Sequence, residues 1–117
     1  MTHDLSEFAD LIHTVDENKS SQRLTTTSIR IKLTFANSTV LYARENYVTH
    51  SGWIDYAYQW QTASHKLIIR WDNAHEVPDI STSPHHQHIG SEENIQASEP
   101  MTLEKVLIFI SAHLISS

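Results

Sequence analysis

The clearest pattern along the chain is a strict alternation of apolar and polar side chains over residues 28–35. The apolar positions share one parity and the basic or hydroxyl positions share the other: Ile29, Ile31, Leu33 and Phe35 against Arg30, Lys32 and Thr34. A period of two is typical of a β-strand that buries one face and exposes the other. The segment therefore predicts a strand whose exposed face is basic.

Three further segments predict strands, at residues 39–48, 53–61 and 66–72. In the last two, aromatic and aliphatic side chains alternate with mostly polar ones. Only a few residues separate one predicted strand from the next, and such short turns favour an antiparallel meander.

Apolar residues at helical spacing occur near both ends of the chain. Asp4 and Glu7 form a capping pattern ahead of a helix predicted over residues 5–17. Thr102 caps a second predicted helix, whose apolar stripe begins at Leu103 and ends at Leu114. We therefore expect a single α+β domain, residues 1–117. Its four-stranded antiparallel sheet would be flanked by an N-terminal and a C-terminal helix on one face.

Residues 73–100 show no sustained period and contain all three prolines, so we interpret them as a long functional loop. This loop holds four of the nine histidines, at positions 75, 85, 86 and 88. Near neutral pH an imidazole can donate or accept a proton, or bind a metal ion.

Two chemistries are open to these histidines. On an extended backbone His86 and His88 point the same way and His85 points the opposite way, so one pair could flank a substrate as general acid and base. Alternatively, a metal could use Asp72 or His75 as a further ligand. Because His85 and His86 diverge and residues 72–88, which hold the candidate ligands, lack glycines for tight ligand turns, we predict no bound metal and no cofactor.

Charge is strongly segregated along the chain, whose formal net charge is −6. Residues 1–18 carry five acids and no Lys or Arg. Residues 19–71 carry seven bases against two acids, a net charge of +5, and residues 72–117 carry seven acids against one base. Such segregation can create a positive face on an acidic protein, although a merely solvated sheet face is the simpler interpretation.

The predicted strand 66–72 carries the strongest phosphate candidate. The planar fork of Arg70 suits an oxyanion, and Asp72 on the same face could orient an imidazole or simply pair with Arg70. Trp71 could stack on a base, although the alternation also explains it as a core residue. The substrate-binding candidates are Arg30, Lys32, Lys66 and Trp71.

Composition excludes several classes of protein. The chain has no cysteine, which excludes disulfides and thiolate metal sites, and its two glycines are too few for a phosphate-cradling loop. The longest apolar run, residues 106–110, is far too short to span a bilayer. The first residues lack the pattern of a signal peptide, so we expect a cytoplasmic protein with no membrane contact.

Several motifs resemble one known family. They are Tyr-Gln-Trp-Gln at 58–61, Leu-Ile-Ile-Arg-Trp-Asp-Asn-Ala at 67–74, Pro-His-His-Gln-His-Ile-Gly at 84–90 and Ser-Glu-Pro-Met at 98–101. Over residues 24–113 the chain resembles the TumE-type toxins of bacterial toxin–antitoxin pairs. The resemblance implies a toxic activity and, as a partner, a helix-turn-helix antitoxin that binds and silences the toxin.

Our leading hypothesis is a metal-independent endoribonuclease whose partner and substrate is RNA. A base would take the proton of the 2′-OH, an acid would protonate the 5′-oxygen, and a cation would support the phosphorane. The candidate catalytic residues are His86 and His88 as acid and base, Arg70 on the phosphate, Asp72 as orienting group, and His85 and Tyr58 as further candidates. A non-enzymatic domain whose histidine loop binds a metal or protein partner is the alternative, and another nucleotide-modifying toxin chemistry is a third. The sequence leaves the oligomeric state open, a homodimer included.

Overall fold

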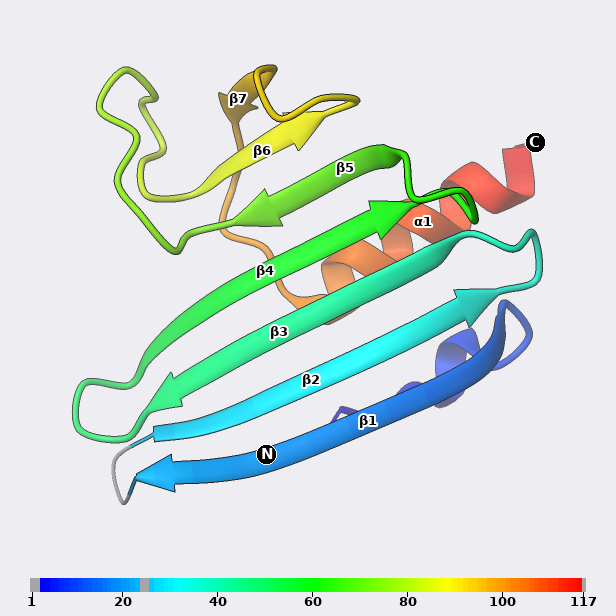
Figure 1. Ribbon diagram of the computed structural model, residues 1–117, viewed down its shortest axis with the longest axis horizontal. Helices are drawn as coiled ribbons and strands as arrows, with labels where there is room; N and C mark the ends of the chain where they lie inside the picture. Colours follow the sequence, from blue (N-terminus) through cyan, green and yellow to red (C-terminus); the bar gives the residue numbers. More distant parts are fainter. Residues whose placement is uncertain (1–2, 24–25, 117) are drawn as a thin grey trace.

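The computed structural model describes residues 3–23 and 26–116 and consists mainly of one antiparallel sheet. Seven strands follow one another in chain order across this sheet, and each pairs with its neighbours in the sequence (Figure 1). The strands are β1 (Ile12–Arg23), β2 (Thr26–Phe35), β3 (Val40–Val48), β4 (Trp53–Gln61), β5 (Leu67–Asp72), β6 (His86–Ile89) and β7 (Ile95–Ala97). They are preceded by a single 3-10 turn, η1 (Ser6–Phe8), and followed by one α-helix, α1 (Leu103–Ser116).

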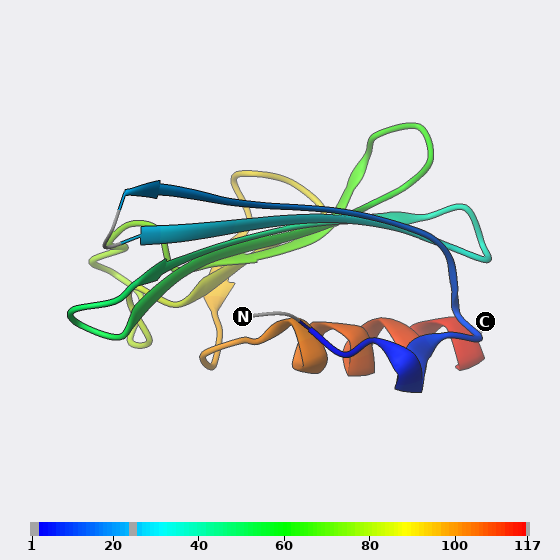
Figure 2. The same cartoon turned by 90° about the horizontal axis from the view of Figure 1, so that it is seen from below.

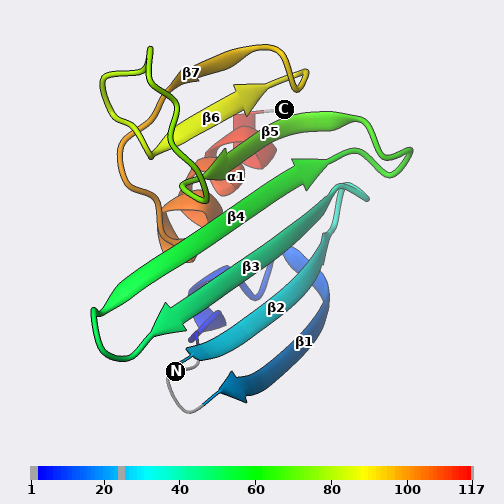
Figure 3. The ribbon, with the colours of Figure 1, turned by 60° about the vertical axis from the view of Figure 1, so that its left-hand side comes forward.

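One face of the sheet is covered and the other is open. Helix α1 and the N-terminal segment with η1 lie on the same side (Figure 2), and α1 runs behind β4 and β5 (Figure 3). Trp60 and Trp71 meet the ring of Phe109 edge-on, with centroids 6.4 and 5.3 Å apart. Neither helix in the described part of the chain is long and apolar enough to cross a membrane.

The central strands and the final helix confirm the sequence prediction. Strands β2 to β5 begin and end within two residues of the predicted segments and form the expected meander. The apolar parity of β2 is buried on the covered face, while Arg30 and Lys32 are exposed on the open face. The backbone N–H of Lys105 donates to Oγ1 of Thr102 at 3.2 Å, which confirms Thr102 as the cap of α1.

The predicted N-terminal helix is wrong. Phe8 is buried, and Leu11 and Ile12 pack against the core, but the side chain of Val15 is 52% exposed, so the apolar stripe ends at Ile12. From there the chain forms the edge strand β1. Pairing with β2 satisfies backbone groups that would otherwise be unpaired along the edge of β2, and this gain outweighs a weak helical preference.

The predicted structureless loop is also wrong in part, because it contains strands β6 and β7. They are only four and three residues long. In β6 the alternating positions 86–88 carry imidazole and amide groups rather than apolar side chains, and β7 is too short to show a pattern. The strands form nevertheless, because β6 pairs with β5 and β7 pairs with β6. The four-stranded sheet between two helices is replaced by a seven-stranded sheet with one C-terminal helix.

Candidate functional site

The candidate site lies where β5 and β6 pair on the open face of the sheet. In this register Asp72 lies opposite His86 and Arg70 lies opposite His88. Because Trp71 between them points toward α1, these four side chains project from the other face. Two alternating residues on each of two neighbouring strands thus bring four polar side chains together.

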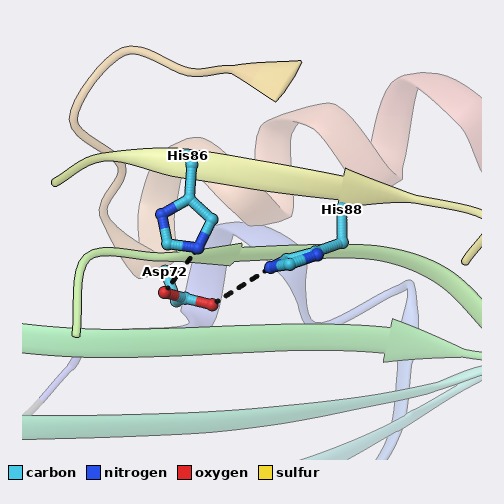
Figure 4. Close-up of side chains that lie close together, drawn as sticks. All are labelled: Asp72, His86 and His88. Carbon is cyan, nitrogen blue, oxygen red and sulfur yellow. Dashed lines mark ion pairs between the residues drawn. The ribbon is translucent and has the colours of Figure 1, made fainter. Parts of the chain in front are cut away.

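Asp72, His86 and His88 form a buried group that we call the Asp72 cluster. Both imidazoles extend from β6 toward the carboxylate on β5 (Figure 4). Nε2 of His86 lies 3.0 Å from Oδ1, and Nε2 of His88 lies 3.8 Å from Oδ2. Asp72 and His88 are each 4% exposed and His86 is fully buried. Nearby, His75 is an exposed residue whose Nδ1 lies 4.0 Å from Oδ1 of Asp72.

The hydrogen bonds of the two rings determine where their protons lie. Nδ1 of His86 is 2.9 Å from the carbonyl oxygen of Pro84, and Nδ1 of His88 is 2.8 Å from that of Glu92. A carbonyl oxygen can only accept, so each Nδ1 carries the proton and donates it. In a neutral ring Nε2 then carries a lone pair and no proton. Both Nε2 atoms are buried without a hydrogen-bond partner among the described residues.

This geometry corrects one premise of the sequence analysis. We predicted no metal because the candidate ligands were expected to diverge. His85 does diverge, but one ligand atom from each of Asp72, His86 and His88 lies within 4.8 Å of the others. Loop reasoning missed this convergence because it did not include the pairing of β5 with β6.

Arg70 connects the Asp72 cluster to the rest of the open face. Its Nε donates to Oδ2 of Asp72 at 3.3 Å. At the far end Nη1 donates to Oε1 of Glu92 at 2.7 Å and Nη2 donates to Oε2 of the same carboxylate. Glu92 lies in the turn that follows Gly90, whose φ of 75° suits glycine. Glu92 therefore holds the guanidinium fork with the two parallel bonds that a phosphate would also form.

Arg70 also lines a groove of about 620 Å³ that crosses the open face from β1 to β5. We call it the cationic groove, because Arg30, Lys32 and Arg44 line it as well. Arg30 and Arg44 face each other directly across β2 and β3. Neither forms an ion pair with any residue that the structure describes. Two like charges in direct opposition destabilise a sheet, so the groove favours an anion.

The structure brings together only part of the predicted site. His85 lies on the covered face, where its ring stacks on Tyr56 and Nδ1 is 2.7 Å from the Tyr56 hydroxyl. Burial lowers the pKa of His85. Trp71 is buried against α1 and cannot stack on a base. Lys66 is exposed in the turn between β4 and β5, outside the groove lining.

Tyr58 belongs to a second polar group on the covered face, centred on the buried carboxylate of Glu45. The hydroxyls of Tyr47 and Tyr58 both donate to Glu45, and Nε2 of His3 bonds to it as well. His3 also bonds through Nδ1 to Glu104 at the start of α1. Burial, followed by the bond to Glu45, raises the pKa of Tyr58 well above its ordinary value. Tyr58 is therefore a buried donor on the face of the sheet opposite to the Asp72 cluster.

Sequence reasoning missed Arg44, Glu45 and Glu92. Arg44 could have been found, because it has the parity opposite to the apolar residues Leu41 and Ala43 of its predicted strand. Glu45 and Glu92 could not, because only the folded chain shows that one is buried among hydroxyls and the other is paired with Arg70.

Fold and site define a class: a small antiparallel sheet that is covered by one helix and carries a buried carboxylate–imidazole cluster beside a cationic groove. The model of the family described as toxin TumE matches residues 3–114, so the chain belongs to the TumE toxin family. The chain is therefore a toxin of the toxin–antitoxin type, and membership implies an antitoxin partner. No curated protein and no solved structure matches it.

The Glu45 group predicts a pH-dependent stability. Burial acts to lower the pKa of His3, but its bonds to Glu45 and Glu104 outweigh burial and raise the pKa above the ordinary 6.5. Protonated His3 then stabilises the folded chain fully below the unfolded pKa, and this contribution is lost as pH rises through the folded pKa. Chemical denaturation should show that His3→Ala lowers the free energy of unfolding more at about pH 6 than at about pH 9.

His13→Ala, at an exposed position of β1, is the matched control and should show no such difference. An equal loss for His3→Ala at both pH values would contradict the assignment of a charged His3.

Proposed function

We propose that this toxin is an endoribonuclease that binds the RNA backbone in the cationic groove and cleaves it at the Asp72 cluster. The observation that carries the proposal is the position of Arg70, whose side chain lines the groove and bonds directly to Asp72. A phosphate held by Arg70 would lie between the binding surface and the cluster.

The cationic groove is suited to bind a polyanion rather than a single small anion. Its cations come from three strands of the sheet, with Arg30 and Lys32 on β2, Arg44 on β3 and Arg70 on β5. Several phosphates of one strand could therefore be bound together, which is the usual source of affinity for nucleic acids. Tyr42, which is 41% exposed in the same groove, offers a ring on which a base can stack.

Glu92 supports the choice of Arg70 as the phosphate ligand. Its carboxylate occupies both terminal nitrogens of Arg70, and its backbone carbonyl accepts from His88. An incoming phosphate would compete with this carboxylate for the same fork of donors. Displacement of Glu92 would then bring RNA to Arg70 and loosen the turn that holds His88.

The chemistry we assign is internal attack of the 2′-OH on the adjacent phosphorus. The proton of the 2′-OH must leave, the bond to the 5′-oxygen breaks, and that oxygen gains a proton. Arg70 would stabilise the charge on the phosphorane, and the Asp72 cluster would manage the protons. In the folded chain the buried Nε2 atoms of His86 and His88 do not touch solvent, which argues against direct contact between either ring and RNA in this state.

Cleavage is tested directly with the full-length chain and a single-stranded RNA. We expect RNA fragments, intact DNA of the same sequence, and growth arrest when the toxin is expressed without its partner. His86→Ala and His88→Ala should each reduce cleavage by about 10²–10⁴-fold, because each removes one imidazole of the cluster at which we place the chemistry. His50→Ala, at an exposed turn position, is the matched histidine control and should cleave like the wild type.

Intact RNA in the presence of active growth arrest would contradict cleavage and favour a non-enzymatic or different toxic chemistry. Wild-type rates in both cluster variants, at equal amounts of folded protein, would contradict the catalytic assignment.

The groove makes a separate prediction about binding. Arg44→Gln should weaken RNA binding and reduce the salt dependence of log K by about one phosphate contact. It should not lower the free energy of unfolding, because it removes a like-charge pair with Arg30. Filter binding at several salt concentrations measures the slope of log K against log salt concentration. The control is Lys105→Gln, which removes a cation of α1 that is paired with Glu99. An unchanged slope for Arg44→Gln would contradict a contact between Arg44 and an RNA phosphate.

A further inference from the structure

We propose that the Asp72 cluster binds one divalent transition-metal ion of the zinc or manganese type, through a carboxylate oxygen of Asp72 and Nε2 of His86 and of His88. Metal binding itself does not depend on RNA being the substrate. It deepens the proposed function only by identifying the group that the buried rings would hold at the reaction centre.

The first support is the direction of the lone pairs. Backbone carbonyls hold the proton of each ring on Nδ1, so both Nε2 lone pairs face the carboxylate of Asp72. A lone pair cannot donate to a carboxylate, and three acceptors facing one another in a buried place repel unless a cation lies among them. A neutral imidazole whose other nitrogen donates to a carbonyl is the usual state of a metal-binding histidine.

The guanidinium of Arg70 bonds to Asp72, but no bond joins it to either imidazole among the described residues. The alternative to a metal ion among the three atoms is therefore a proton on the rings themselves. One protonated ring, His86, would pair with Asp72 at 3.0 Å and leave Nε2 of His88 without a partner. Two protonated rings would place two buried charges with centroids 5.0 Å apart, beside the cation of Arg70, against the single carboxylate of Asp72. A metal ion satisfies all three atoms while both rings stay neutral.

The second support is distance. Ligand atoms about 2.0–2.2 Å from a tetrahedral zinc ion lie roughly 3.4 Å from one another. Nε2 of His86 lies 3.0 Å from Oδ1 of Asp72, and Nε2 of His88 lies 3.8 Å from the other oxygen, Oδ2. One ligand atom from each of the three residues lies within 4.8 Å of the others. Side-chain rotations that close these separations to about 3.4 Å would place one ion at bonding distance from one oxygen of Asp72 and from both Nε2 atoms.

The third support is the set of ligands. Two imidazoles and one carboxylate suit zinc, manganese or iron, whereas magnesium and calcium prefer oxygen ligands alone. All three ligands come from paired strands rather than from a mobile loop, so their positions are held by the sheet. Exposed His75, whose ring centroid lies 4.8 Å from that of His86, can supply a fourth ligand at the outer side.

The test measures metal binding without RNA. The untagged, full-length chain is washed with a chelator and titrated calorimetrically with Zn²⁺, Mn²⁺ and Mg²⁺ as separate probes. We expect one Zn²⁺ or Mn²⁺ per chain and much weaker binding of Mg²⁺. Asp72→Asn and His88→Ala should weaken Zn²⁺ binding at least tenfold, whereas His50→Ala, an exposed histidine outside the cluster, should leave it unchanged.

A second measurement avoids the risk that the cluster variants do not fold. Histidine ¹⁵N spectra of the metal-free wild type should show neutral His86 and His88 with the proton on Nδ1, and Zn²⁺ should shift their Nε2 signals. Doubly protonated rings at neutral pH, or a folded wild type that binds no stoichiometric metal, would overturn the proposal. RNA cleavage that persists in excess chelator would leave the proposed function intact while contradicting a catalytic role for the metal.

Discussion

The register between β5 and β6 is the constraint on which the candidate site depends. It places Asp72 opposite His86 and Arg70 opposite His88, all on the face away from α1. Because side chains alternate along a strand, a slip of one residue would turn the β6 imidazoles to the covered face and break the cluster. Trp71, buried under α1 between Arg70 and Asp72, opposes a slip of β5, since the slip would move its ring into water.

The two faces of the sheet serve different purposes. The covered face carries the apolar core and the Glu45 group, whose hydroxyl and imidazole partners satisfy one buried carboxylate. On the open face two sets of polar groups have no partner among the described residues: the opposed cations Arg30 and Arg44, and the two Nε2 atoms of the cluster. An anion would stabilise the first set, and a cation would stabilise the second. Arg70 lies between them, which is where an RNA phosphate and a metal ion would meet.

The sequence predicts the middle of this protein well and its edges poorly. Strands with alternating apolar residues, such as β2, and the capped helix α1 are predicted because burial alone sets their pattern. The prediction of an N-terminal helix was wrong because the pairing of β1 with β2 outweighs the preference of a short apolar stripe for a helix. In the site, the common direction of His86 and His88 follows from an extended backbone, whereas their approach to Asp72 requires a strand pairing that no local pattern reveals.

X-ray absorption at the zinc edge tests the central claim most directly, because it reports the atoms around the ion and not only the presence of binding. The chelator-washed chain is reloaded with one equivalent of Zn²⁺. Our account predicts nitrogen and oxygen neighbours at about 2.0–2.2 Å, with imidazole scattering from at least two rings that is lost in a folded His88→Ala variant. A spectrum of hydrated zinc without imidazole scattering, or one unchanged in that variant, would contradict a metal centre at Asp72, His86 and His88.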